Sequence, residues 1–196
     1  MKKCCTYVVI FTILWLLLAG MAMQQQALSS KLIRIHVLAA SDSAEDQAIK
    51  LQVRDAVLRQ LSLLTADCAD RKEAAAVLIG CAEQLGKTAA NTADQRVTLQ
   101  LSPESYGTRR YENFSLPAGE YLSLQIRIGA GEGRNWWCVA FPMVCMAATA
   151  EEFEAAATSA GLDGAQIRLM TGEETDIKVR FIVLEWLEAL KTRFFS

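Results

Sequence analysis

The chain has 196 residues, of which 52% are hydrophobic, and its 20 basic and 22 acidic residues give a formal net charge of −2. A mildly acidic chain without a basic run is a poor match for a phosphate backbone, so we expect no nucleic-acid partner. The single histidine, His36, excludes every zinc motif that needs two histidines. We therefore expect neither a metal nor a cofactor.

The N-terminus predicts a signal peptide or a single-span membrane anchor over residues 1–27. Lys2 and Lys3 precede an uncharged stretch from Cys4 to Ser30, whose most apolar part reads VVIFTILWLLLA. A basic start, an apolar run and small residues at its exit are typical of a signal peptide. The apolar length is borderline for the roughly 17 to 20 residues that cross a bilayer, so cleavage and retention both stay open. In either case the N-terminus enters or spans the membrane, and we expect residues 28–196 to form one exported domain.

A strand is predicted immediately after this segment. Three branched aliphatic residues, Ile33, Ile35 and Val37, alternate with Arg34 and His36. Successive side chains of a strand point to opposite faces, so the pattern indicates one apolar face and one polar face. We expect the polar face to be open to a partner.

A polar turn and a long helix follow the strand. Ser41 to Ser43 supply capping oxygens, and Glu45 and Asp46 stand at the spacing of a capping box. Apolar residues at helical spacing predict that this helix continues to about Leu64.

The remaining elements complete an α+β or mixed α/β fold. We expect a second helix over 67–90, which is rich in alanine, and a short helix over 149–160 that ends at Gly161. Alternating patterns predict strands from residue 95 to the break at Pro103, over 122–128 and over 136–141. We read the glycines at 129, 131 and 133 as a hairpin turn, and 178–195 as a terminal helix or as a strand followed by one. The prediction is a small sheet packed by two or three helices.

Four cysteines fall in the exported part. If Cys68 and Cys81 share one helix, the rise per residue separates them by roughly 20 Å, too far for a disulfide. Cys138 and Cys145 flank the segment VAFPMV and could close a small loop. We favour a disulfide or buried thiols over a metal site for this pair.

Two groups of residues are candidates for chemistry or binding. His36 and Asp42 could form an acid–base pair in an envelope hydrolase, although a lone histidine on a strand is more often held in a hydrogen bond. Trp136 and Trp137 are adjacent, so in a strand they point to opposite faces, and one of them could anchor a protein partner.

The chain resembles the stage II sporulation protein R family in four segments that occur in the family's order: IRIHVLAASDSAEDQAIKLQVRDAVL, YENFSLPAGEY, IGAGEGRNWWCVAFPMVC and VRFIVLEW. It departs from the family at Ala40, where asparagine is typical, and at Met143 and Val144, where a second proline and a leucine are usual. These departures affect local turns more than the assignment.

The resemblance implies a signalling protein and not an enzyme. Proteins of that family are made in the forespore and exported into the space between the forespore and mother-cell membranes. There they activate a membrane-bound aspartic protease of the mother cell, which processes the precursor of the mother-cell sigma factor. The resemblance implies no catalytic residues. Our hypothesis for the surface that contacts the protease comprises seven residues: Arg34, His36, Asp42, Arg54, Asn135, Trp136 and Trp137.

Overall fold

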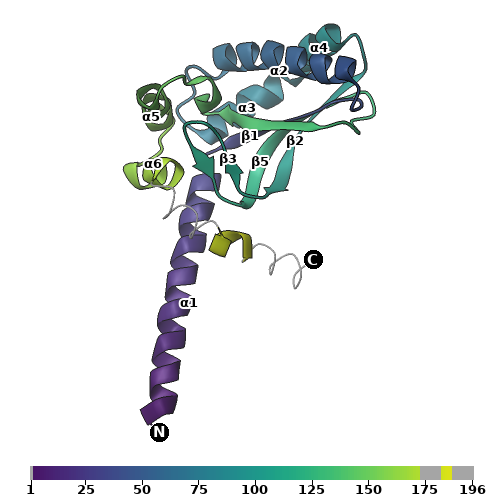
Figure 1. The fold of residues 1–196 in the computed structure, drawn as a ribbon. Helices are drawn as coiled ribbons and strands as arrows, with labels where there is room; N and C mark the ends of the chain where they lie inside the picture. The colour runs from purple at the N-terminus through teal and green to yellow at the C-terminus, as the bar shows by residue number, and fades with distance from the viewer. Residues whose placement is uncertain (1, 173–181, 187–196) are drawn as a thin grey trace. The chain divides into compact units, whose positions relative to one another are not determined.

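A computed structural model describes residues 2–172 and 182–186 of the chain (Figure 1). The chain divides into two compact units. The first comprises Met1–Ser29, Ser105–Glu120 and Gly164–Ser196, and the second comprises Ser30–Glu104 and Tyr121–Asp163.

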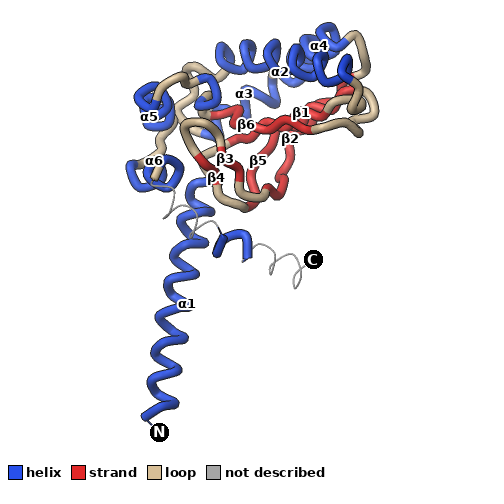
Figure 2. Tube along the Cα trace, viewed as in Figure 1, coloured by secondary structure: helices blue, strands red, loops and turns tan. Residues whose placement is uncertain are grey.

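The second unit contains most of a four-stranded sheet with strand order β2-β5-β1-β6 (Figure 2). Its strands are β1 (Ile33–Leu38), β2 (Val97–Tyr106), β5 (Gly119–Ile128) and β6 (Asn135–Phe141). The inner strand β1 runs parallel to β5 and antiparallel to β6. Its helices are α2 (Ala44–Leu64), α3 (Arg71–Gly80), α4 (Ala82–Ala93), α5 (Ala150–Ser159) and the 3₁₀ turn η1 (Val144–Met146).

The first unit contains the long N-terminal helix α1 (Lys2–Ser29) and the shorter helix α6 (Gly164–Thr171). Its two-stranded sheet pairs β3 (Arg109–Arg110) with β4 (Ser115–Leu116). Residues 182–186 are helical, and the rest of the predicted element over 178–195 lies outside the described residues.

The predicted fold class is confirmed, because the structure has a small mixed sheet packed by helices and an apolar N-terminal helix. The helix predicted to end near Leu64 is α2, which is capped by Ser43. The short helix before Gly161 is α5, which is capped by Thr149, and Gly161 has a φ of 78°. The boundary at residue 27 stays a prediction.

The prediction of one continuous helix over 67–90 is wrong. The structure has two helices, α3 and α4, which meet at Cys81. Gly80 weakens the helix at this point, and α4 instead packs against α2. Cys68 precedes α3, so Cys68 and Cys81 do not share a helix, and both thiols are free.

The strand predicted to stop at Pro103 continues through it to Tyr106. Proline lacks the amide hydrogen that an inner strand must donate, so it is tolerated on edge strands. β2 lies at an edge of the sheet, which accounts for the longer strand.

The hairpin predicted at the glycines is also wrong, because β1 lies between β5 and β6 in the sheet. The loop from residue 129 to 134 therefore passes the end of β1. The amide of Gly133 donates to the carbonyl of Ala39 at 3.0 Å, and a Cβ at Gly133 would overlap the carbonyl oxygen of Ser41. Gly129 and Gly131 have positive φ values of 54° and 68°. The glycines thus permit a close crossing of two chain segments.

Candidate partner-binding surfaces

The junction between β1 and α2 is a network of short polar side chains. The Ser43 hydroxyl accepts from the Asp46 amide at 3.1 Å, as the N-cap position requires. The Ser43 amide donates to the Ser41 hydroxyl at 3.1 Å, and that hydroxyl donates to the Asp46 carboxylate at 2.5 Å. The N-cap half of the expected capping box is therefore present, whereas the Asp46 carboxylate accepts a hydrogen bond from the Ser41 hydroxyl. This hydrogen bond, followed by one from Gln95, lowers the pKa of Asp46.

A buried lysine joins α2 to the glycine loop. Lys50 is only 6% exposed, and its Nζ donates to the side chain of Gln47 at 2.6 Å and to the carbonyl of Arg134 at 2.9 Å. Burial lowers its pKa, and the nearby Arg134 charge acts in the same direction. The sequence pattern gave no sign of this role, because Lys50 stands at the spacing of an exposed helix face.

Asp42 holds the same loop from its other side. Its carboxylate accepts from the Arg134 amide at 2.7 Å, and the Arg134 side chain lies 3.6 Å away. Both side chains are largely exposed, so the ion pair adds little to stability. These contacts hold the chain just before β6, which begins at the exposed Asn135.

The two tryptophans point to opposite faces of the sheet. Trp136 pairs with Val37 and Trp137 pairs with His36 in the register of β6 against β1. The guanidinium of Arg54, on α2, lies 5.3 Å from the centre of the Trp136 ring. We call Arg54, Asp55, Asn135 and Trp136 the α2 surface. The Arg54 Nε donates to Asp55 at 2.7 Å, and this contact lowers the pKa of the Asp55 carboxyl.

On the opposite face His36 stacks on Trp137, with ring centres 5.4 Å apart. Its Nδ1 lies 2.8 Å from a carboxylate oxygen of Glu104, on β2. His36 is 8% exposed, and among the described residues its Nε2 has no hydrogen-bond partner. Asp42 instead contacts Arg134, so the structure does not bring His36 and Asp42 together as the hydrolase hypothesis requires. The sequence gives no sign of Glu104 as a partner of His36, because the predicted strand ends at Pro103 and Glu104 lies beyond it.

Arg34 is fully buried, which corrects the expectation of an open polar face on β1. Its guanidinium lies 5.3 Å from the ring centre of Tyr121, and its Nε is 3.4 Å from the carbonyl of Cys138. All residues from Ile33 to Val37 are buried, because β1 is an inner strand. Arg34 and His36 therefore support the sheet from within, whereas Arg54, Asn135 and Trp136 reach its surface.

A disulfide joins Cys138 to Cys145 and closes the turn between β6 and η1. The Cα atoms are 6.3 Å apart, within the ordinary range. The Val139 amide donates to the Cys145 sulfur at 3.1 Å. This bridge ties the middle of β6 to η1.

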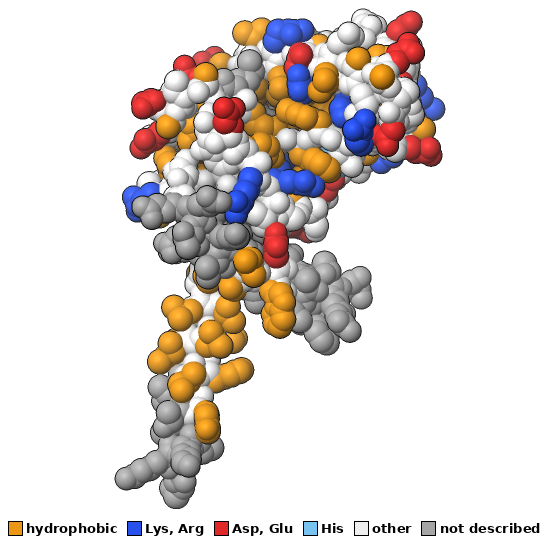
Figure 3. Space-filling model, viewed as in Figure 1, with side chains coloured by type: hydrophobic (Ala, Val, Ile, Leu, Met, Phe, Trp, Pro, Cys, Tyr) orange, Lys and Arg blue, Asp and Glu red, His pale blue; other side chains and the backbone are white. Residues whose placement is uncertain are grey.

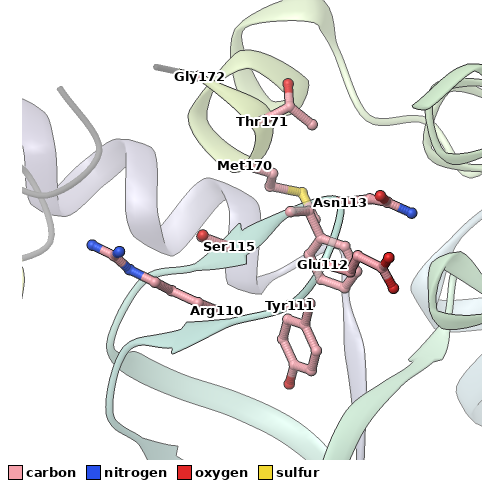
Figure 4. A pocket seen from close by; sticks show the side chains of 9 residues that line it. Arg110, Tyr111, Glu112, Asn113, Ser115, Met170, Thr171 and Gly172 are labelled. Carbon is pink, nitrogen blue, oxygen red and sulfur yellow. The ribbon is translucent and has the colours of Figure 1, made fainter. Parts of the chain in front are cut away.

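In the first unit, the turn between β3 and β4 and the end of α6 line a pocket of about 280 Å³. Tyr111 and Phe114 stack within the turn, with ring centres 4.5 Å apart. Met170 extends from α6 toward the turn, whereas Arg110 points away from it (Figure 4). The pocket mixes aromatic, thioether and polar groups, as small binding sites commonly do.

These features define a mixed α/β protein that follows an N-terminal helix long and apolar enough to cross a membrane. A family model described as stage II sporulation protein R matches residues 29–151. The chain is also 34% identical to stage II sporulation protein R of Bacillus subtilis (strain 168) over 155 residues, which cover 72% of this chain and 68% of that protein. The chain therefore belongs to the stage II sporulation protein R family. No solved structure matches it.

Proposed function

We propose that this protein is an intercompartmental signal of sporulation. It is exported from the forespore into the space between the two membranes, where it activates a membrane-bound aspartic protease of the mother cell. The activated protease then processes the precursor of the mother-cell sigma factor. The observation that carries the proposal is membership of the stage II sporulation protein R family over residues 29–151.

The N-terminal helix supports the exported location. Residues Ile10–Ser29 are long and apolar enough to cross a bilayer, and the family match begins at the last of them. An apolar helix at this place suits either a signal or an anchor, and both direct the following residues across the membrane.

The α2 surface, which holds three of the seven hypothesised contact residues, fits a protein partner best. Tryptophan and arginine are the residues most often found at the energetic centre of protein interfaces. Trp136 and Arg54 are partly exposed and hold each other in place, and Asn135 is exposed beside them. A preformed pair loses less side-chain entropy on binding than two mobile side chains. We therefore propose that this surface contacts the protease and that Arg34 and His36 act only through the sheet.

Co-expression in a host that does not sporulate tests the proposal. The protease and the sigma-factor precursor are produced with or without this protein, and cleavage of the precursor is followed by immunoblot. We expect cleavage to rise when the protein is present. Unchanged cleavage, with all three proteins present in their proper fractions, would refute the activation.

A double variant, His36→Ala with Asp42→Ala, separates signalling from the hydrolase alternative. Activation should persist in a folded double variant, because neither residue belongs to the α2 surface. Loss of activation without loss of folding would instead favour a direct role for these two side chains.

A further inference from the structure

The ends of two helices meet at a pocket of about 400 Å³ in the second unit. Ser62 lies in the last turn of α2, and Thr65 follows that helix as its C-cap. Ala156 and Ser159 belong to the last turn of α5. The third wall is the end of β6 and the turn that follows it, residues 141–143. The pocket therefore lies between two helix C-termini.

Both helix ends favour positive charge. The last carbonyl groups of a helix lack partners within it, and together they give this end a partial negative charge. Neither α2 nor α5 has a basic residue in its last turn. Asp67 adds a carboxylate, and no lysine, arginine or histidine is among the described residues that line the pocket. Its described walls thus carry negative charge and no balancing cation.

The thiol of Cys68, which also lines the pocket, experiences the same negative charge. Burial raises the pKa of this thiol, and the charges of Glu73, Asp67 and Asp70 raise it further. Acidic side chains also gather over α5 (Figure 3), where their field attracts cations. The surroundings of the pocket therefore favour a positively charged ligand.

A cation of this chain already binds close by. Lys31, Arg71 and Lys72 line a second pocket, which shares Ala160 with the first. There the Lys31 Nζ donates to the carbonyl of Gly161 at 2.6 Å, two residues after the end of α5. The chain beyond α5 thus accepts an ammonium group, and Lys31 does not line the first pocket.

We propose that the pocket between α2 and α5 binds the arginine side chain of a protein partner. Phe141 and Met143 offer an apolar wall to the methylene groups of an arginine. Its guanidinium has five N–H donors in one plane, and the Asp67 carboxylate and the hydroxyls of Ser62 and Ser159 are acceptors in the lining. A lysine would present only a compact ammonium. The inference goes beyond the proposed activation, because the pocket recognises an arginine whichever protein carries it.

Protection of Cys68 tests the proposal on the full chain in a non-ionic detergent. Iodoacetamide, an uncharged reagent, alkylates the free thiols, and peptide mapping by mass spectrometry follows each cysteine separately. Acetyl-arginine amide, titrated over the millimolar range that suits a single side chain, should slow the alkylation of Cys68 at least about twofold. Acetyl-citrulline amide has a similar shape without the charge and should not protect it. Cys81, between α3 and α4, is the internal control and should react at the same rate throughout.

Two alanine variants complete the test. Ala156→Met fills the pocket and should abolish the protection, whereas Ala155→Met changes the exposed neighbour and should retain it. Equal protection by the arginine and citrulline compounds would overturn the proposal, and so would protection that persists in Ala156→Met. A Cys68 that iodoacetamide does not reach, or that arginine does not protect, would overturn it as well. These readouts do not involve the protease, so they are separate from the test of the proposed activation.

Discussion

The folded state stabilises the charged form of the Asp46 carboxylate. Hydrogen bonds from Ser41 and Gln95 hold its pKa below the ordinary value of 3.8. A carboxylate whose pKa is lower in the folded state than in the unfolded state stabilises the fold at pH values above the unfolded-state pKa. This contribution is lost as the pH falls through the lower, folded-state pKa.

Asp46→Asn should therefore unfold at lower urea concentration than the wild type at pH 7, and the difference should shrink as the pH falls below about 3.8. Urea titrations at neutral and acid pH measure this difference. Glu45→Gln is the matched control, because Glu45 is exposed in the same helical turn. A difference for Asp46→Asn that stays constant with pH would contradict the assignment.

Arg54 and Trp136 should be energetically coupled, because the guanidinium lies over the ring. Partly exposed cation–π pairs contribute about 0.5–1 kcal/mol. A double-mutant cycle with Arg54→Ala and Trp136→Ala, measured by chemical unfolding, should give a coupling of that size. Strictly additive effects would mean that the two side chains do not stabilise each other.

Among the connections between elements, the glycine loop that crosses the end of β1 is tightly constrained. A Cβ at Gly133 would meet the backbone carbonyl of Ser41, which cannot rotate away as a side chain would. Gly133→Ala should lower the free energy of unfolding by about 1–3 kcal/mol. Gly107→Ala is the control, since no atom lies within 4 Å of a Cβ placed there. Equal stability of the two variants would show that the loop does not pass the strand as described.

The elements with local signals could be predicted from the sequence. The bounds of β1 and α2 follow from an alternating pattern and from the cap at Ser43, which depend on neighbouring residues only. The break at Cys81 could not be predicted in this way, because α4 changes direction to pack against α2. The path of the glycine loop past β1 could not be predicted either, because it depends on which strands become neighbours in the sheet.

The candidate surface was only partly predictable for the same reason. Adjacent tryptophans in a strand must diverge, and they do. The sequence pattern does not predict the burial of Arg34 and Lys50. Each side chain bonds to a carbonyl far along the chain, Arg34 to that of Cys138 and Lys50 to that of Arg134. To identify the residues of the candidate surface, the register of β6 is therefore needed as well as the sequence pattern.

At the scale of the whole molecule, the proposed signal depends on one surface and on one helix. Trp136→Ala should lower precursor cleavage in the co-expression assay by about tenfold if it removes an interface anchor worth about 1.4 kcal/mol. Leu63→Ala, on α2 with a side chain that is 81% exposed, should leave cleavage unchanged. Equal cleavage with both variants, at equal protein levels, would place the contact elsewhere.

Export should be as necessary as the surface. Leu14 and Leu16 are exposed in the apolar part of α1, and arginine at the centre of a membrane helix costs about 2.5–3.5 kcal/mol per residue for insertion. The variant with Leu14→Arg and Leu16→Arg should therefore stay on the side where it was made. The residues of the family match are unchanged in this variant.

The most direct test of the account is the fraction of sigma-factor precursor that is cleaved when the protease is co-expressed with the exported chain or with this export-defective variant. We predict cleavage with the exported chain and only the background level with the variant. Equal cleavage by both, at equal amounts of protein, would contradict a signal that acts from across the membrane.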